Sequence, residues 1–242
     1  SIGGALALHS QLIDEKKTKI NISSIPSPYL GVCIEKEEIE SFIKKIKKNK
    51  KYRIYNKKIN YYASKFLSKN YILARCVGRA EFGARALGNR SILSNPENLN
   101  LKQIIDDKIE SRDFWMPFAA TVLKEKSALY FQKNASTENL SYMTNCIKTT
   151  TKGAVLLKAA IHPADFTCRA QLLEKNNNTL YHDLIKTFGK ITGNYALLNT
   201  SLNFHGSPLA NTISDSFKIV DKSDLDGLLL DGYLIVKRDI KI

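Results

Sequence analysis

Short apolar runs alternate with amphipathic helical patterns along most of this 242-residue chain. The helical patterns cover 35–48, 57–69, 99–110, 178–193 and 214–222, and the clearest strand-like runs are YILARCV, PFAATVL, NYALLNT and YLIVK. Further strand-like runs lie near 143–149, 154–161 and 168–174. Few regular hairpins join them. This alternation predicts an α/β or α+β fold, with a mixed sheet flanked by helices.

The chain is basic, with 37 Lys and Arg against 23 Asp and Glu and a formal net charge of +14. Such a charge suggests nucleic acid, an anionic membrane or a phosphorylated substrate as partner. Residues 1–69 carry +9 of it, mostly as lysines on helical faces. Because Lys, Asn and Ile are abundant together, we attribute this excess to coding bias and solvated surfaces, and nucleic acid is the weaker interpretation.

The other composition signals point to an ordinary globular chain. No apolar run is long enough to span a bilayer, so we expect no membrane partner. The four cysteines are far apart, which favours buried free thiols in a reducing compartment, and we expect a cytoplasmic location. The histidines lack the spacing of a metal-binding motif, so we expect no metal site.

The arginines are concentrated in one part of the chain. Five of the eight fall within 38 residues, namely Arg75, Arg79, Arg85, Arg90 and Arg112. Residues 83–91 imitate a phosphate-binding GxxxxGK[ST] loop, but Asn89 occupies the lysine position. Any phosphate here would therefore depend on arginine side chains, which bind it bidentately. The alternative is that these arginines form internal pairs with carboxylates and brace the loop.

Two later segments carry polar side chains in similar settings. Asn199-Thr-Ser-Leu-Asn203-Phe-His-Gly206 follows an apolar strand, as a ligand-binding loop would. A hydrogen-bonded turn with Asx caps is the alternative. HPADFTCR (162–169) supplies another isolated arginine, Arg169.

Four blocks together resemble the C-terminal domain of the O-carbamoyltransferase family, which includes tobramycin, cephem and nodulation-factor carbamoyltransferases. GRAEFGARALGNRSIL (78–93) is similar to GRxEFGPRALGxRSIL, and SRDFWMPFAATVL (111–123) to RExFRPFAPxVL. HPADFTCRAQ is similar to HxxDxTxRxQ, and TGNYALLNTSLNFHGSPLA (192–210) to TGxPxLLNTSFNxxGEPIV. The blocks keep the family's order, and the resemblance covers roughly residues 29–238.

The resemblance implies a YrdC-like twisted mixed sheet flanked by helices over residues 29–242. Such a domain binds carbamoyl phosphate and ATP with Mg²⁺ and forms a carbamoyl-adenylate. An N-terminal Kae1-like domain, which carries an iron site, then transfers the carbamoyl group to a hydroxyl of a sugar or other secondary metabolite. Residues 1–28 resemble the end of that domain and a linker, so we expect its iron ligands and acceptor pocket to lie outside this chain.

The resemblance also implies a binding site for the substrate and nucleotide, without naming a catalytic residue. The matching positions are Arg79, Arg85, Asn89, Arg90, Ser91, Arg112, Arg169, Asn199, Ser201, Asn203 and His205. Arg85 and Arg169 match basic positions that hold carbamoyl phosphate or nucleotide phosphates.

Several positions depart from the family pattern. Glu110 replaces a ligand-binding Lys, Met116 the Arg of RPF, and Ser207 the Glu of GEP, while His205 stands where some members carry Arg. Each lost charge-assisted hydrogen bond would cost about 1.5–3 kcal/mol. Two alternatives to the active domain therefore remain: an inactive ligand-binding domain of the same fold, and a YrdC-like RNA-binding module.

Overall fold

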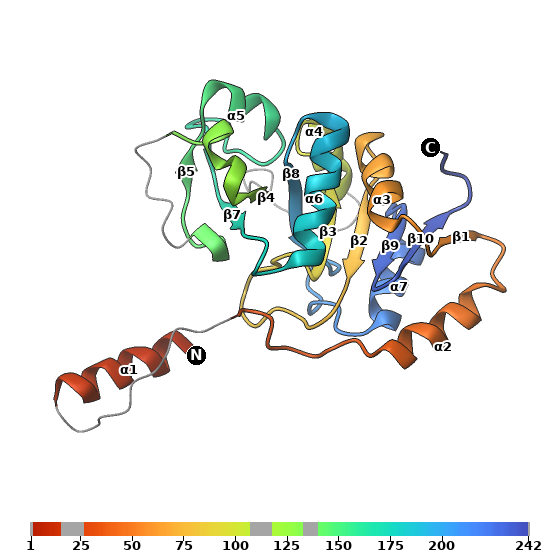
Figure 1. The fold of residues 1–242 in the computed structure, drawn as a ribbon, viewed down its shortest axis with the longest axis horizontal. Coiled ribbons are helices and arrows are strands. Elements are labelled where there is room, and N and C mark those ends of the chain that lie inside the picture. The colour runs from red at the N-terminus through yellow and green to blue at the C-terminus, as the bar shows by residue number, and fades with distance from the viewer. Residues whose placement is uncertain (1, 16–26, 107–117, 133–139, 242) are drawn as a thin grey trace.

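An eight-stranded mixed sheet forms the centre of the protein (Figure 1). The structure is a computed structural model that describes residues 2–15, 27–106, 118–132 and 140–241. The sheet runs in the order β1-β10-β9-β2-β3-β8-β4-β7. Only the β2–β9 and β4–β7 pairs are parallel. The predicted mixed sheet flanked by helices is confirmed.

The strands are short and mostly buried, as their apolar runs require. Their bounds are β1 Tyr52–Tyr55, β2 Leu73–Cys76, β3 Arg90–Ser94, β4 Ala119–Leu123, β7 Ala170–Leu173, β8 Ala196–Ser201, β9 Gly227–Leu230 and β10 Tyr233–Lys237. A separate two-stranded ladder pairs β5 (Ile147–Lys148) with β6 (Thr167–Cys168).

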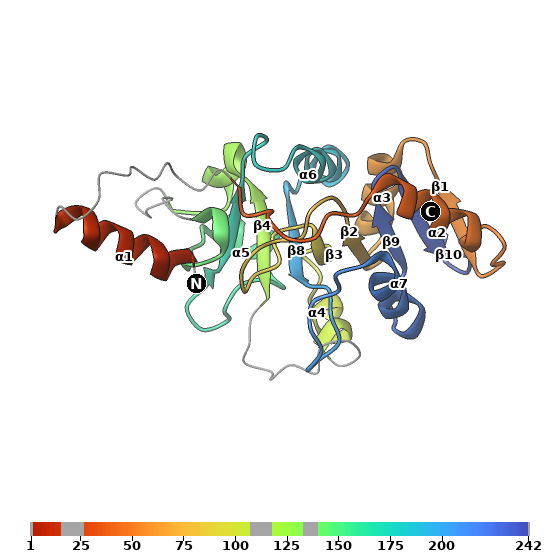
Figure 2. The same ribbon diagram turned by 90° about the horizontal axis from the view of Figure 1, so that it is seen from below.

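Helices cover both faces of the sheet (Figures 1 and 2). Helices α3 (Ile59–Ser68) and α6 (Thr179–Thr192) pack side by side on one face, over Leu73, Leu93 and Leu197. Helices α2 (Lys36–Ile46), α4 (Leu99–Ile105) and α7 (Ile213–Lys222) lie on the other, over Ala74, Cys76 and Ile92. Because successive strand residues point to opposite faces, each apolar strand contributes side chains to the apolar cluster on either face of the sheet.

A smaller group of elements surrounds the β4–β7 edge of the sheet and has its own apolar cluster. It consists of α5 (Thr151–Leu156), the ladder β5–β6 and two 3₁₀ turns, η2 (Lys124–Leu129) and η3 (Leu140–Tyr142). Helix α1 (Ile2–Asp14) lies apart from the sheet (Figure 1). Among the helices that the structure describes, none is long and apolar enough to cross a bilayer.

Two local predictions were wrong. Residues 154–161 are not a strand, because 151–156 form α5, where the Thr150 hydroxyl caps the amide of Gly153 at 2.9 Å. At Gly153 a Cβ would lie 2.0 Å from the carbonyl oxygen of Tyr130, so only glycine permits this close packing. Strand β1, which pairs with β10, was not predicted.

The cysteine prediction was confirmed in part. All four cysteines are free thiols, and Cys76 and Cys168 are buried. Burial raises the pKa of the Cys168 thiol to about 12. Cys146 is exposed and Cys33 half-buried, so burial does not extend to every thiol.

Candidate functional site

The order of the strands brings the three polar segments singled out in the sequence to one end of the sheet. Strands β3 and β4 both run antiparallel to β8, and β7 runs parallel to β4. The starts of β3, β4 and β7 therefore meet the end of β8. The loop 78–89 leads into β3, Arg169 immediately precedes β7, and Ser201 ends β8. Three separate sequence segments, spread over residues 78–201, thus meet at one end of the sheet.

A buried glutamate shapes the loop before β3. The Glu81 carboxylate oxygen Oε1 accepts hydrogen bonds from the backbone amides of Leu87 and Asn89 at 2.7 Å and of Arg90 at 3.3 Å. The hydroxyl of Ser91 accepts another from the Gly88 amide at 3.0 Å. These bonds satisfy buried amides that would otherwise lack partners, and they fix the course of the loop.

Two of the clustered arginines brace this loop from within. Arg90 is fully buried, and its terminal nitrogens donate to the carbonyls of Val77, Gly78, Asn89 and Val32 at 3.0–3.2 Å. Arg75 donates to the Gly88 carbonyl at 2.5 Å and to Asn89 Oδ1 at 2.7 Å. These two arginines therefore brace the loop, as the alternative expected, but the acceptors are carbonyl oxygens and not the carboxylates that it predicted.

Asn89 is also committed to internal contacts. Its Nδ2 donates to the Arg79 carbonyl, and its Oδ1 accepts from Asn178 Nδ2, both at 2.8 Å. Asn89 and Ser91 are buried as well. Because these residues are buried and hydrogen-bonded within the loop, their part in the motif at 78–91 is structural. Only the exposed residues of the loop can contact a ligand at the surface.

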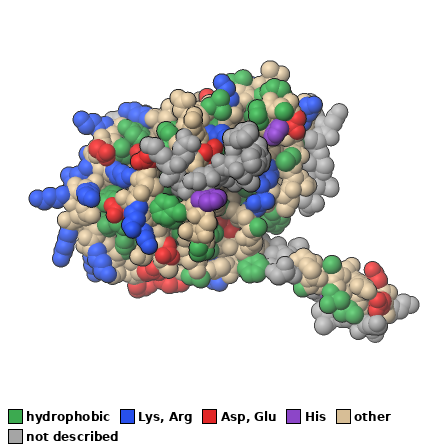
Figure 3. Space-filling model, turned by 180° about the vertical axis from the view of Figure 1, so that it is seen from behind, with side chains coloured by type: hydrophobic (Ala, Val, Ile, Leu, Met, Phe, Trp, Pro, Cys, Tyr) green, Lys and Arg blue, Asp and Glu red, His purple; other side chains and the backbone are tan. Residues whose placement is uncertain are grey.

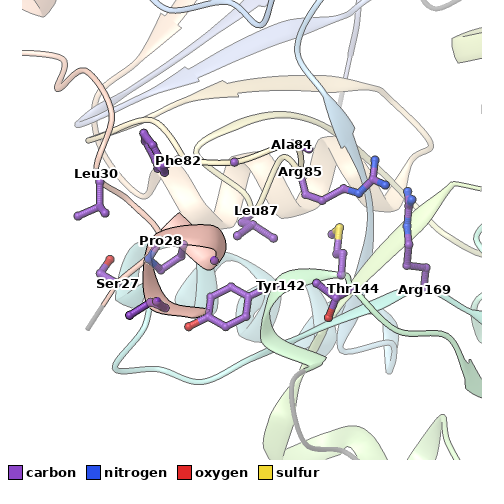
Figure 4. Close-up of a pocket in the computed structure, with 14 residues that line it drawn as sticks. Ser27, Pro28, Leu30, Phe82, Ala84, Arg85, Leu87, Tyr142, Thr144 and Arg169 are labelled. Atoms are coloured by element: carbon purple, nitrogen blue, oxygen red, sulfur yellow. The ribbon is translucent and has the colours of Figure 1, made fainter. Parts of the chain in front are cut away.

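Arg85 and Arg169 converge at the surface beside this loop. Figure 4 shows the two guanidinium groups turned toward each other. Both residues line a cavity of about 860 Å³ and also a narrow recess of about 40 Å³ at its side. Arg85 is exposed and forms no hydrogen bond or ion pair with any residue that the structure describes. Two like charges at one cavity repel each other unless an anion lies between them.

A turn before β6 sets the position of Arg169. The Asp165 carboxylate accepts hydrogen bonds from the Thr167 amide at 2.9 Å and the Thr167 hydroxyl at 2.8 Å. These bonds lower the pKa of the Asp165 carboxyl. Cys168, the next residue, is fully buried and pairs with Ile147. Arg169 is thus held between two strands, with a half-buried side chain.

The end of β8 forms the wall of the narrow recess through Asn199, Thr200 and Ser201. Asn199 Nδ2 donates to the Ala86 carbonyl at 3.2 Å and to Thr121 Oγ1 at 3.0 Å. Its Oδ1 is buried without a partner among the described residues. The wall is therefore polar and is fixed to the loop that carries Arg85.

The remaining predicted residues lie elsewhere. Arg79 is exposed and bridges through its backbone to Cys33, away from the two cavities. Asn203 Nδ2 donates to the carbonyls of Phe204 and Ser207, which is the turn alternative, and the neighbouring His205 is exposed. Neither lines the recess. Arg112, like Glu110 and Met116, lies outside the described residues.

Sequence reasoning missed the apolar part of the larger cavity. Its lining includes Leu30, Phe82, Leu87, Tyr142 and Met143. Phe82 is 51% exposed and Tyr142 41%, which is unusual for side chains of this size. No motif marks η3, so only the fold could place Tyr142 opposite Phe82. In the described part of the chain, no three His, Cys, Asp or Glu side chains gather as a metal site would require.

Comparison with known proteins identifies relatives of this fold. The sequence profile described as "Carbamoyltransferase C-terminus" matches residues 64–237. An uncharacterized protein of Methanocaldococcus jannaschii is 31% identical over 90% of this chain and 35% of its own length. Nodulation protein NolNO of Sinorhizobium fredii is 35% identical over 73% of this chain and 26% of its own. The 3'-hydroxymethylcephem-O-carbamoyltransferase of Amycolatopsis lactamdurans is 29% identical over 62% of this chain and 27% of its own length.

Solved structures give more distant matches. Full-length HypF in its phosphate- and nucleotide-bound form aligns with a TM-score of 0.49 and 16% identity, over 71% of this chain and 24% of that one. A Sua5 variant of P. abyssi aligns with a TM-score of 0.44 and 9% identity, over 71% of this chain and 49% of that one. The chain spans about a third of the length of the curated relatives that it matches. Because the family profile covers most of the chain, the protein belongs to the carbamoyltransferase C-terminal domain family.

Proposed function

We propose that this domain binds carbamoyl phosphate and ATP with Mg²⁺ and forms a carbamoyl-adenylate. One water hydrolyses carbamoyl phosphate to carbamate and phosphate, and a carbamate oxygen then attacks the α-phosphorus of ATP and displaces pyrophosphate. The observation that carries the proposal is the convergence of Arg85 and Arg169 at one cavity, in a member of a carbamoyltransferase family. Both substrates are polyanions. Their reaction at phosphorus needs charge neutralisation and alignment rather than a protein nucleophile.

The two guanidiniums supply that neutralisation. Each presents a planar set of N–H donors that matches two oxygens of one phosphate. The 40 Å³ recess between them has space for one small group, and the Ser201 end of β8 lines it. We place the phosphate of carbamoyl phosphate or of the nucleotide there. The apolar side chains of the larger cavity would then contact the less polar part of the nucleotide.

The braced loop keeps Arg85 in place without neutralising it. Glu81 is the nearest acid in sequence, but its Oε1 is occupied by backbone amides. Arg90 and Arg75 are likewise used inside the loop. This division of roles leaves Arg85 available to a ligand. Transfer of the carbamoyl group to an acceptor hydroxyl would require residues beyond this chain, which spans about a third of its curated relatives.

Calorimetric titration of the whole chain with carbamoyl phosphate, and then with ATP and Mg²⁺, tests the proposal. We expect Arg85→Ala and Arg169→Ala each to weaken carbamoyl phosphate binding by at least about tenfold, because each removes a charge-assisted contact. Arg53→Ala is the matched control, since Arg53 is an exposed arginine on β1 at the far edge of the sheet. It should bind as the wild type does.

The outcomes separate the alternatives. Pyrophosphate release that depends on carbamoyl phosphate would support adenylate formation. Binding without that release would identify an inactive ligand-binding domain. Unchanged binding in both arginine variants would refute the site.

A further inference from the structure

A second cavity, of about 530 Å³, opens on the face of the sheet covered by α3 and α6. Residues from the start of α3, from α6 and from the turn between β9 and β10 line it, and Figures 1 and 2 show α3 beside α6. It shares no lining residue with the cavity of Arg85 and Arg169. Its lining includes Tyr61, Val77, Leu184 and Leu229, so most of it is apolar.

Arg75 lines this cavity, and only one of its three guanidinium nitrogens donates hydrogen bonds within the described part of the chain. The side chain is 3% exposed, and the Tyr181 ring lies 5.1 Å from its central carbon. Both of its hydrogen bonds are donated by Nη1. Nε and Nη2 have no acceptor among the described residues, and no described carboxylate lies within ion-pair distance of the guanidinium. This Nε–Nη2 edge is the one that pairs with the two oxygens of a carboxylate.

Three charged residues line the cavity, Lys58, Arg75 and Asp231. The carboxylates of Asp231 and Glu81 both act on the Arg75 guanidinium through space, but neither forms an ion pair with it. One oxygen of Asp231 already accepts from the Gly78 amide at 2.9 Å. Lys58 is the exposed N-cap residue of α3, and it lies at the rim of the cavity. A buried cation without a paired anion is costly, which favours an anionic occupant.

We propose that this cavity binds a small carboxylate with an apolar body, held by the Nε–Nη2 edge of Arg75 and by Lys58 at its rim. The Asp231 and Glu81 carboxylates near Arg75 repel a polyanion such as ATP more strongly than a monoanion. The volume lies within the range of small-ligand sites. Arg75 also donates a hydrogen bond to the Gly88 carbonyl, so an occupant would be linked to the loop that presents Arg85 through the Arg75 side chain.

Saturation-transfer NMR of the full chain with 4-phenylbutyrate tests the site, with 4-phenylbutyramide as the uncharged probe. We expect the carboxylate to bind at least about tenfold more tightly than the amide. Arg75→Lys keeps the charge but lacks the two-pronged edge, and should abolish the preference. Because Arg75 also braces the loop, a second variant at the exposed rim, Lys58→Glu, is needed; it should weaken carboxylate binding by about fivefold.

Lys57→Glu is the matched control, since Lys57 is exposed one residue away and does not line the cavity. It should leave binding unchanged. Arg85→Ala should also retain phenylbutyrate binding, so this inference can fail or succeed separately from the proposed function. Equal binding of acid and amide, or equal effects of Lys57→Glu and Lys58→Glu, would overturn it.

Discussion

Gly88 fixes the backbone beneath Arg85. Its φ is +114°, and a Cβ there would lie 2.3 Å from Cδ1 of the buried Tyr181 ring. Gly88→Ala therefore combines backbone strain with a clash in the core. We expect it to lower the free energy of unfolding by at least about 2 kcal/mol, measured by urea denaturation.

Gly83 provides the comparison, because it adopts φ +137° but has no atom within 4 Å of a Cβ. Gly83→Ala introduces the strain without the clash, on an exposed loop, so its loss of stability should be the smaller one. A loss as large as that of Gly88→Ala would mean that Tyr181 does not limit this position.

The sequence could group the arginines but could not divide them. Arg85 and Arg90 are five residues apart in one motif, yet one is exposed and the other fully buried. A motif specifies residue type and spacing. The burial of each residue depends on which other segments of the chain pack against it. Here the carbonyls of Val32 and Val77, which lie outside the motif, accept hydrogen bonds from the buried Arg90 guanidinium. The division between buried bracing arginines and exposed arginines therefore depends on tertiary contacts.

At the scale of elements, Asp226 joins the starts of β2 and β9. Its Oδ2 accepts from the Ile72 amide at 2.6 Å, and burial raises its pKa from 3.8 to about 6. Between about pH 4 and 6 the native state retains a proton that the unfolded chain releases. Stability should therefore fall as the pH rises through this window, and the loss persists above it.

Asp226→Asn removes this titration while keeping an oxygen for the Ile72 amide. At pH 7 the variant should be more stable than the wild type by at most about 3 kcal/mol, and the difference should disappear near pH 4. Thermal unfolding across this range measures it. Asp239→Asn should reduce the pH dependence without abolishing it, because the Asp239 carboxylate is one of the charges that raise the pKa of Asp226. A stability difference between the wild type and Asp226→Asn that stayed constant from pH 4 to pH 7 would contradict this assignment.

Element predictions succeeded where a periodic pattern was long and failed where it was short. The 14-residue α6 is amphipathic, capped by Asn178 and ended by Gly193, and its sequence showed each feature. The apolar run at 154–161 is shorter, and periodicity alone does not separate a buried helix from a strand. Strand β1 has only four residues, and it exists because β10, about 180 residues later, offers an edge.

At the scale of the molecule, the charge is divided between two places. Lys and Arg side chains gather at the end away from α1 (Figure 3). That end holds α2, which packs against α7 and carries the exposed Lys44, Lys45, Lys47 and Lys48 at its close. The proposed substrate site lies among β3, β8, β4 and β7, in the other half of the sheet. Charges beyond about 8 Å are largely screened at physiological salt.

The distribution of charge predicts how lysine and arginine variants should differ. Replacing Lys44, Lys45, Lys47 and Lys48 together by Gln should change the Kd for carbamoyl phosphate by less than about twofold at physiological salt, since these charges are exposed and distant from Arg85. The same variant tests the nucleic-acid interpretation, because a lysine surface that bound RNA would lose affinity with a shallower salt dependence. We expect calorimetry to show an unchanged Kd for carbamoyl phosphate. We also expect RNA titration to show the same affinity and salt dependence as for the wild type. Loss of carbamoyl phosphate binding comparable to that of Arg85→Ala would show that the whole basic surface, rather than two positioned arginines, attracts the anion.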